Sequence, residues 1–301
     1  MRTKAILISL VFALAGYASL VVPAQQDEDV RGAFMTTRPK PTGKVTGENS
    51  SAPKPSRRRP KPVTVVKNDD KKKPVSKPTP VPAGSLNSAR LGLGLTLFMR
   101  DSNGLAIRTD PAHEFQKGDH VRFLIETNAD GYLYVFNTTD GGQPVMIYPD
   151  PELDEGGNYF QAHVPFELPS STAAEERLRW LTFDEKPGAE KLYFVFTREP
   201  LSAVPIEDDL ITFCRDNSRK CPWNPAADVW TRIQEEMNGP VKVAKARASG
   251  GRQTSGEQRA VVRGIGLNRN DPEPSLIMLT ASTSKNVLVA VVDLVHKSAG
   301  D

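Results

Sequence analysis

The sequence predicts a mainly β protein: an antiparallel β-sandwich with one short α-helix in its C-terminal half. Many short runs alternate apolar and polar residues with period two, and turns rich in Gly, Asn and Asp separate these runs. Residues 25–85 lack such runs and are instead rich in Lys and Pro. We therefore expect a signal peptide at residues 1–24, a disordered basic linker at residues 25–85 and one β-sandwich domain at residues 86–301.

The N-terminus indicates export to the periplasm or the extracellular space. Arg2 and Lys4 precede an uncharged apolar run that ends in Val-Pro-Ala, and polar residues follow. This order of charge, apolar core and small residues is typical of a secretory signal peptide and predicts cleavage between Ala24 and Gln25. The alternative is a retained membrane anchor, but the run falls short of the roughly 20 residues of a spanning helix. Contact with the membrane is thus expected only through the transient signal segment.

Residues 25–85 contain too few apolar side chains to form a core, so we predict an extended tether that reaches on the order of 150 Å. Between Thr36 and Ala83 there are 13 basic and three acidic residues, a charge of +10 in a chain of net charge +3. Two roles fit this arm: a binder of anionic polymers and a solvated spacer. No aromatic residues interleave the Lys and Arg as base-stacking platforms would, so specific nucleic-acid readout is not expected. A domain without the arm should be as stable as the mature chain.

The clearest strands lie between Lys117 and Pro149. Residues 121–125 alternate in polarity, residues 132–136 are aromatic and branched, and residues 145–148 run up to the proline. The turn sequences Asn-Ala-Asp-Gly and Asp-Gly-Gly separate the three runs. Together they predict an antiparallel three-strand meander.

Shorter strands are expected on both sides of this meander. Asn103-Gly104 predicts a hairpin between residues 91–98 and 105–107. Asn224-Pro225 predicts the start of a helix that Gly239-Pro240 ends. Residues 287–295 are almost continuously apolar, which predicts a central strand covered on both faces. The other predicted strands are residues 163–168, 179–183, 192–197, 259–267, 275–281 and 286–296.

Cys214 and Cys221 are the two cysteines of the chain. In an exported protein such a pair predicts a disulfide rather than two free thiols. A zinc site is not expected, because there is no second cysteine pair and the nearest histidine is His163.

No catalytic, cofactor-binding or metal-binding residues are assigned from motifs. Residues 150–158 form an acidic loop, but Glu155 and Gln161 occupy the positions where an EF-hand needs Gly and Glu. Neither a nucleophile elbow nor a His-Glu-x-x-His motif occurs. We therefore do not predict an enzyme. An acidic hydrolase site without a motif is the alternative.

One stretch resembles a known family. KGDHVRFLIETNADGYLYVF, followed by IYP, by Leu168-Pro169 and by KPGAEKLYFVFTREPL, is similar to the bacterial domain of unknown function 4384 over residues 91–201. The resemblance implies an exported or envelope-associated β-domain and offers no catalytic residues. Residues 202–301 would be an extension that completes the sheet. The expected function is a binding or scaffolding module for an unidentified protein or cell-envelope component. The alternatives are an envelope hydrolase and a polyanion or cell-wall binder that acts through residues 36–83.

Overall fold

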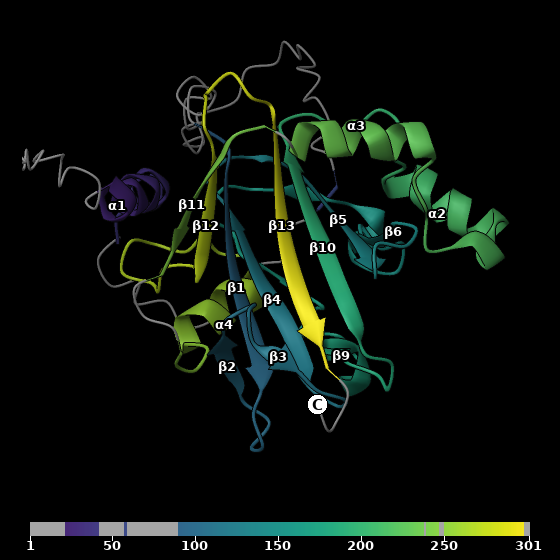
Figure 1. Cartoon of the computed structure of the whole chain (residues 1–301), viewed down its shortest axis with the longest axis horizontal. Helices are drawn as coiled ribbons and strands as arrows, with labels where there is room; N and C mark the ends of the chain where they lie inside the picture. The colour runs from purple at the N-terminus through teal and green to yellow at the C-terminus, as the bar shows by residue number, and fades with distance from the viewer. Residues whose placement is uncertain (1–21, 42–56, 59–89, 238, 247–249, 298–301) are drawn as a thin grey trace, which may run out of the picture.

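Two sheets pack face to face around one main apolar core (Figure 1). The structure, a computed structural model, describes residues 22–41, 57–58, 90–237, 239–246 and 250–297. Phe123 in one sheet contacts Phe194 in the other, with ring centroids 5.3 Å apart. The arrangement confirms the predicted β-sandwich.

Seven strands form the first sheet, in the order β11-β12-β1-β4-β8, with β2 beside β1 and β9 beside β4. Six strands form the second sheet, in the order β3-β13-β10-β5-β6, with β7 beside β5. The described pairs are antiparallel except for β3 with β13. The strands of the first sheet are β1 (Gly92–Arg100), β2 (Ala106–Thr109), β4 (His120–Thr127), β8 (Phe166–Leu168), β9 (Leu181–Thr182), β11 (Val241–Lys245) and β12 (Leu276–Thr280). Those of the second are β3 (Glu114–Phe115), β5 (Gly131–Thr139), β6 (Val145–Tyr148), β7 (Tyr159–Phe160), β10 (Gly188–Thr197) and β13 (Val287–His296).

The predicted meander is wrong at its first turn. β4 pairs with β1, β8 and β9, whereas β5 pairs with β10, β6 and β7 in the opposite sheet. The turn therefore carries the chain across the sandwich. Asn128 holds this crossing to the first sheet, because its side chain accepts the amide of Gly92 at 2.6 Å and donates to the carbonyl of Arg90 at 2.9 Å.

The described residues contain more helix than the one element that the sequence predicts. The α-helices are α1 (Val22–Met35), α2 (Glu207–Asp216), α3 (Ala227–Met237) and α4 (Ser255–Arg263), and the 3-10 helices are η1 (Asp154–Gly156), η2 (Glu176–Arg179) and η3 (Ser218–Lys220). The predicted helix corresponds to α3. There Trp230 packs on the outer face of the second sheet, 4.9 Å from the ring of Tyr193. None of these helices is both long and apolar enough to cross a bilayer.

Residues 259–267 form most of α4 and the turn after it, so the predicted strand there is wrong. The Thr254 hydroxyl accepts the Glu257 amide, and the Glu257 carboxylate accepts the Thr254 amide, which is a reciprocal capping box. Gly264 ends the helix with φ of 61°. The period-two alternation that predicted a strand here is thus a poorer guide than the capping box and the terminal Gly, which indicate a helix.

The N-terminal boundary of the predicted linker requires correction. Residues 22–41, which we call the N-terminal segment, lie against the sandwich: α1 packs on β11 and β12 through Val30 and Phe34. The guanidinium of Arg57 lies 4.2 Å from the ring centroid of Phe160 and is buried. Most of the rest of the predicted linker and residues 1–21 of the signal peptide lie outside the described residues. Ala24 and Gln25 lie in α1, and cleavage between them stays a prediction.

Candidate functional site

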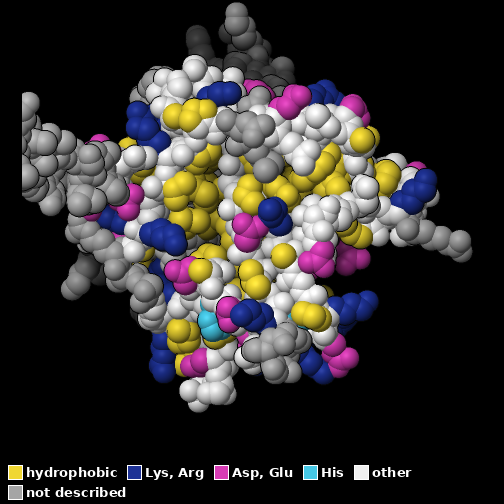
Figure 2. Space-filling model, viewed as in Figure 1, with side chains coloured by type: hydrophobic (Ala, Val, Ile, Leu, Met, Phe, Trp, Pro, Cys, Tyr) yellow, Lys and Arg dark blue, Asp and Glu magenta, His cyan; other side chains and the backbone are white. Residues whose placement is uncertain are grey.

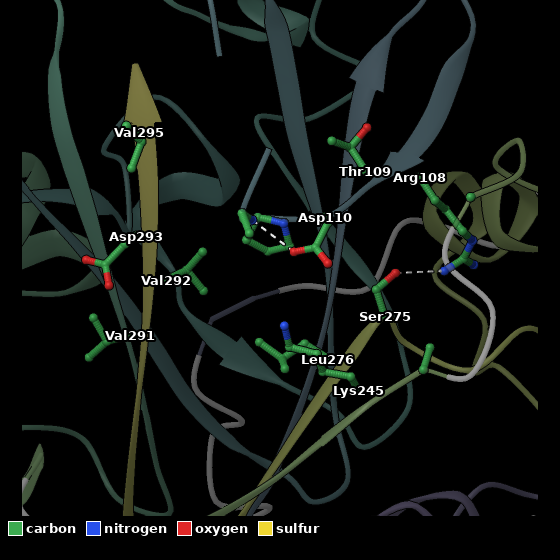
Figure 3. Close-up of a pocket in the computed structure, with 14 residues that line it drawn as sticks. Arg108, Thr109, Asp110, Lys245, Ser275, Leu276, Val291, Val292, Asp293 and Val295 are labelled. Carbon is green, nitrogen blue, oxygen red and sulfur yellow. Dashed lines mark hydrogen bonds between the residues drawn. The ribbon is translucent and has the colours of Figure 1, made fainter. Parts of the chain in front are cut away.

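A groove of about 530 Å³ lies between β13 and the ends of β2, β11 and β12 (Figure 3). Hydrophobic side chains are visible across the middle of this face, over β12 and β13 (Figure 2). This volume falls in the range of about 300–1,000 Å³ that ligand clefts occupy. The groove is lined by residues 108–112, Lys245, Ala246, Gly250, Ser275, Leu276, residues 291–293 and Val295.

The floor of the groove is apolar. Val292 is buried in the main core, and Leu276 packs against the same core while it remains partly accessible. Val295 is 44% exposed at the rim. Apolar lining of this kind favours a ligand with aliphatic groups.

One wall of the groove is held by a buried ion pair. Arg108 pairs with Glu257 of α4, and its guanidinium lies 5.4 Å from the ring centroid of Phe98. Its Nη1 also reaches the hydroxyls of Thr96 at 3.3 Å and Ser275 at 3.5 Å. The charge of Arg108 is therefore neutralised by Glu257, and the side chain is held in place as part of the wall.

The remaining charges lie nearer the mouth. One carboxylate oxygen of Asp110 accepts the amide of Ala112 at 2.9 Å, and Asp293 lies 3.4 Å from the amine of Lys191. For Lys245, no side-chain partner is found among the described residues, and its amine extends toward the groove (Figure 3). Lys245 is thus the cationic group at the mouth without an ion-pair partner among the described residues, and Asp110 is the anionic one.

The edge of β13 that borders the groove is open. β13 pairs with β10 over its whole length, but on its other side it pairs with β3 only at Val295 and His296. The prediction of a central strand is therefore only partly correct. Apolar side chains do cover both faces near its start, whereas most of one hydrogen-bonding edge has no neighbouring strand among the described residues.

A second constellation joins the N-terminal segment to the sandwich. His163 lies between Glu126 and Thr37, with Nδ1 2.7 Å from the Glu126 Oε1 and Nε2 2.9 Å from the Thr37 Oγ1. Arg38 donates to both carboxylate oxygens of Glu126, at 2.8 and 2.6 Å. Arg38, Glu126 and His163 are all buried.

This constellation has the order of a hydroxyl, imidazole and carboxylate triad, but its hydrogen bonds are those of a structural clamp. The Thr37 hydroxyl donates its one proton to the carbonyl of Phe34 at 2.5 Å, so the nucleophile-to-base bond of a triad is missing. Arg38 neutralises the carboxylate that would support the base. We assign the cluster to holding the N-terminal segment.

The clamp depends on an ionised Glu126. Burial alone would raise the pKa of this carboxyl, but hydrogen bonds from His163 and Arg38 and their charges outweigh burial and lower it. Because the pKa is lower in the folded state, the stabilisation is present above the unfolded-state pKa and is lost as the pH falls through the folded-state value.

Cys214 in α2 and Cys221 after η3 form a disulfide, with Cα atoms 5.3 Å apart. Cys214 packs at the edge of the cluster that contains Trp223 and Trp230. The bond therefore joins the end of α2 to the loop that leads into α3, as the sequence predicts. It lies outside the groove.

Removal of this bond should destabilise the fold moderately. Replacement of both cysteines by Ser should lower the free energy of unfolding by about 2.5 kcal/mol, from the entropy of so short a loop in the unfolded chain. Urea denaturation of the oxidised protein and of the double variant measures the difference. Equal stabilities, or two alkylatable thiols in untreated protein from the native host, would contradict the role of the bond.

The acidic loop forms η1 and contributes to packing. Glu155 pairs with Arg58 at 2.7 Å, and Asp150 accepts the amide of Glu152 within the loop. In the part of the chain that the structure describes, no three His, Cys, Asp or Glu side chains gather as metal ligands would.

Sequence reasoning missed the groove and the clamp, because both join residues far apart in the chain. In the sequence Arg38 looks like one of many linker cations, because no aromatic or apolar run follows it to mark a buried segment. The Thr-Ser-Gly-Glu capping box at residues 254–257 was a usable signal for α4, which supplies the partner of Arg108.

Residues 114–200 match the family model of a domain of unknown function (DUF4384). The match confirms the resemblance for that segment, which runs from β3 to just beyond β10. No curated protein and no solved structure matches the chain. All the residues that line the groove lie outside the matched segment.

Proposed function

We propose that this chain, whose residues 114–200 form a DUF4384 domain, is an exported, envelope-associated binding or scaffolding module that binds its partner in the groove beside β13. Three features of the described residues support this most directly, because they meet in one hollow: an apolar floor, a Lys245 amine without a side-chain partner and an open strand edge. Stable binding surfaces combine an apolar centre with a few oriented polar groups.

Export is supported by the signal-peptide pattern and is compatible with the disulfide. The clamp offers a further link between export and folding. Because the predicted cleavage site between Ala24 and Gln25 lies in the first turn of α1, the N-terminal segment reaches its place on the sandwich only if the chain beside that site is free to dock.

Site-specific photo-crosslinking in the native host tests the proposal. A photoreactive amino acid at Val295 should give a discrete crosslinked product in the exported fraction, and the additional substitution Leu276→Glu in the floor should abolish it. The matched control is Leu178, which is 47% exposed on η2, away from the groove. Identical products from both positions, or an uncleaved chain in the cytosol, would refute the proposed function.

A further inference from the structure

We infer that the partner contributes an extended segment with an acidic side chain, which adds as a strand to the open edge of β13. This inference rests on the proposed function and specifies its partner. It follows from the direction of the backbone groups of β13, from the shape of the groove and from its charge.

The backbone of β13 directs hydrogen-bonding groups at the groove that have no backbone partner within the described ranges. The Lys297 amide donates to the Phe115 carbonyl on β3, whereas Asn286 accepts from Arg198, which follows β10. Because these groups alternate in direction along a strand, odd-numbered residues point their N–H and C=O toward the β3 side. The backbone groups of Val291 and Asp293, which both line the groove, are therefore directed at the open edge.

An edge of this kind requires a cover. Residues 287–294 contain a single charged residue, Asp293, and no proline. Exposed strand edges in soluble proteins are usually protected by charges, prolines, bulges or a covering element, because the row of free groups otherwise pairs with another chain. Addition of a strand satisfies these groups and is a recurrent mode of peptide recognition.

The shape of the groove favours a single strand over a second copy of the chain. The edge is flanked by residues 108–112 and by Lys245 of the other sheet, with a cavity of about 530 Å³ between them. A lone extended segment can lie in such a hollow, whereas the edge of another folded sheet brings its own neighbouring strands and loops against these walls.

The charge of the groove specifies the segment further. Arg108 and Asp293 have protein partners, and Asp110 accepts a hydrogen bond from its own turn. Lys245 has no such partner in the described part of the chain, so an acidic side chain is its natural complement. Aliphatic side chains on the same segment would face Leu276 and Val292.

The test is a phage-displayed library of random nine-residue peptides, selected on the full mature protein. Enriched peptides should contain alternating aliphatic residues and an Asp or Glu, and should bind Lys245→Glu roughly tenfold more weakly. Binding to the Lys245→Glu protein should be restored when the acidic residue of the peptide is replaced by Lys.

Two variants at one exposed position separate strand addition from other binding. Asp293→Pro removes an amide that points at the groove and leaves the ladder with β10, so it should weaken the peptide roughly tenfold or more. Asp293→Ala keeps the amide and is the matched control. Hydrogen exchange provides the second readout: the bound peptide should protect the amides of residues 291 and 293 and leave those of residues 290 and 292 unchanged.

The outcomes are distinct. Peptides that bind Asp293→Pro and Asp293→Ala equally, or that protect no alternate amides, overturn strand addition and leave a groove-binding function intact. A library that yields no peptide also overturns it, and the photo-crosslinks from Val295 then decide the proposed function separately. Association of the protein with itself through the same amides would show that a second copy is the occupant and would overturn the inference.

Discussion

Replacement of Arg38 by Ala should lower the free energy of unfolding by about 3–5 kcal/mol, because it leaves the Glu126 carboxylate buried without its main counter-charge. The side chain also donates to three backbone carbonyls, those of Asn268, Asp271 and Pro272, which lose a partner in the variant. Urea denaturation followed by tryptophan fluorescence measures the change.

Two further variants show whether the stability loss of Arg38→Ala comes from the ion pair. Lys40→Ala, two residues away and exposed, should change stability by less than about 0.5 kcal/mol. Arg38→Lys should fall between the two, because an ammonium keeps the charge but cannot bond both carboxylate oxygens in a plane. If Arg38→Ala and Lys40→Ala are equally stable, the clamp does not hold the fold together.

Deletion of the whole N-terminal segment should have the larger effect. A chain that begins at residue 42 exposes Ala244, Ile277 and Leu279, which α1 covers, and leaves the clamp without Arg38. The combined loss is a large part of the about 5–15 kcal/mol that stabilises a typical domain. We expect aggregation or a melting transition lowered by more than about 15 °C, measured by circular dichroism.

The control deletion removes residues 60–85 and keeps the N-terminal segment. The composition of residues 60–85 predicts no packed core, so the melting temperature of this deletion variant should change by only a few degrees. A synthetic peptide of residues 22–41 added to the shortened chain should restore part of the transition. A chain from residue 42 that melts like the mature protein would show that the whole predicted linker is dispensable, as the sequence alone suggests.

Local patterns predict the sandwich well, because the order of apolar and polar residues within each strand indicates which side chains are buried. The runs at residues 192–197 and 286–296 become β10 and β13, which pair along their length. The hairpin at Asn103-Gly104 joins β1 and β2 as expected. Such features depend on alternation and turn chemistry over a few residues, which a single sequence contains.

Contacts between segments that are distant in the chain cannot be predicted from such local patterns. The crossing after β4 looks like any tight turn, and only the pairing of β4 with β1 shows that it changes sheets. Arg38 and Glu126 are 88 residues apart, and neither has a local signature of burial. The groove likewise combines three chain regions, each of which is unremarkable alone.

The basic residues Arg57 and Arg58 are held on the sandwich by their own charges. Arg58 pairs with Glu155 and Asp208, and the guanidinium of Arg57 lies over the ring of Phe160. An anionic polymer that binds Arg58 would therefore compete with carboxylates of the domain for the same guanidinium. Binding of such a polymer and attachment of this part of the chain to the sandwich would oppose each other.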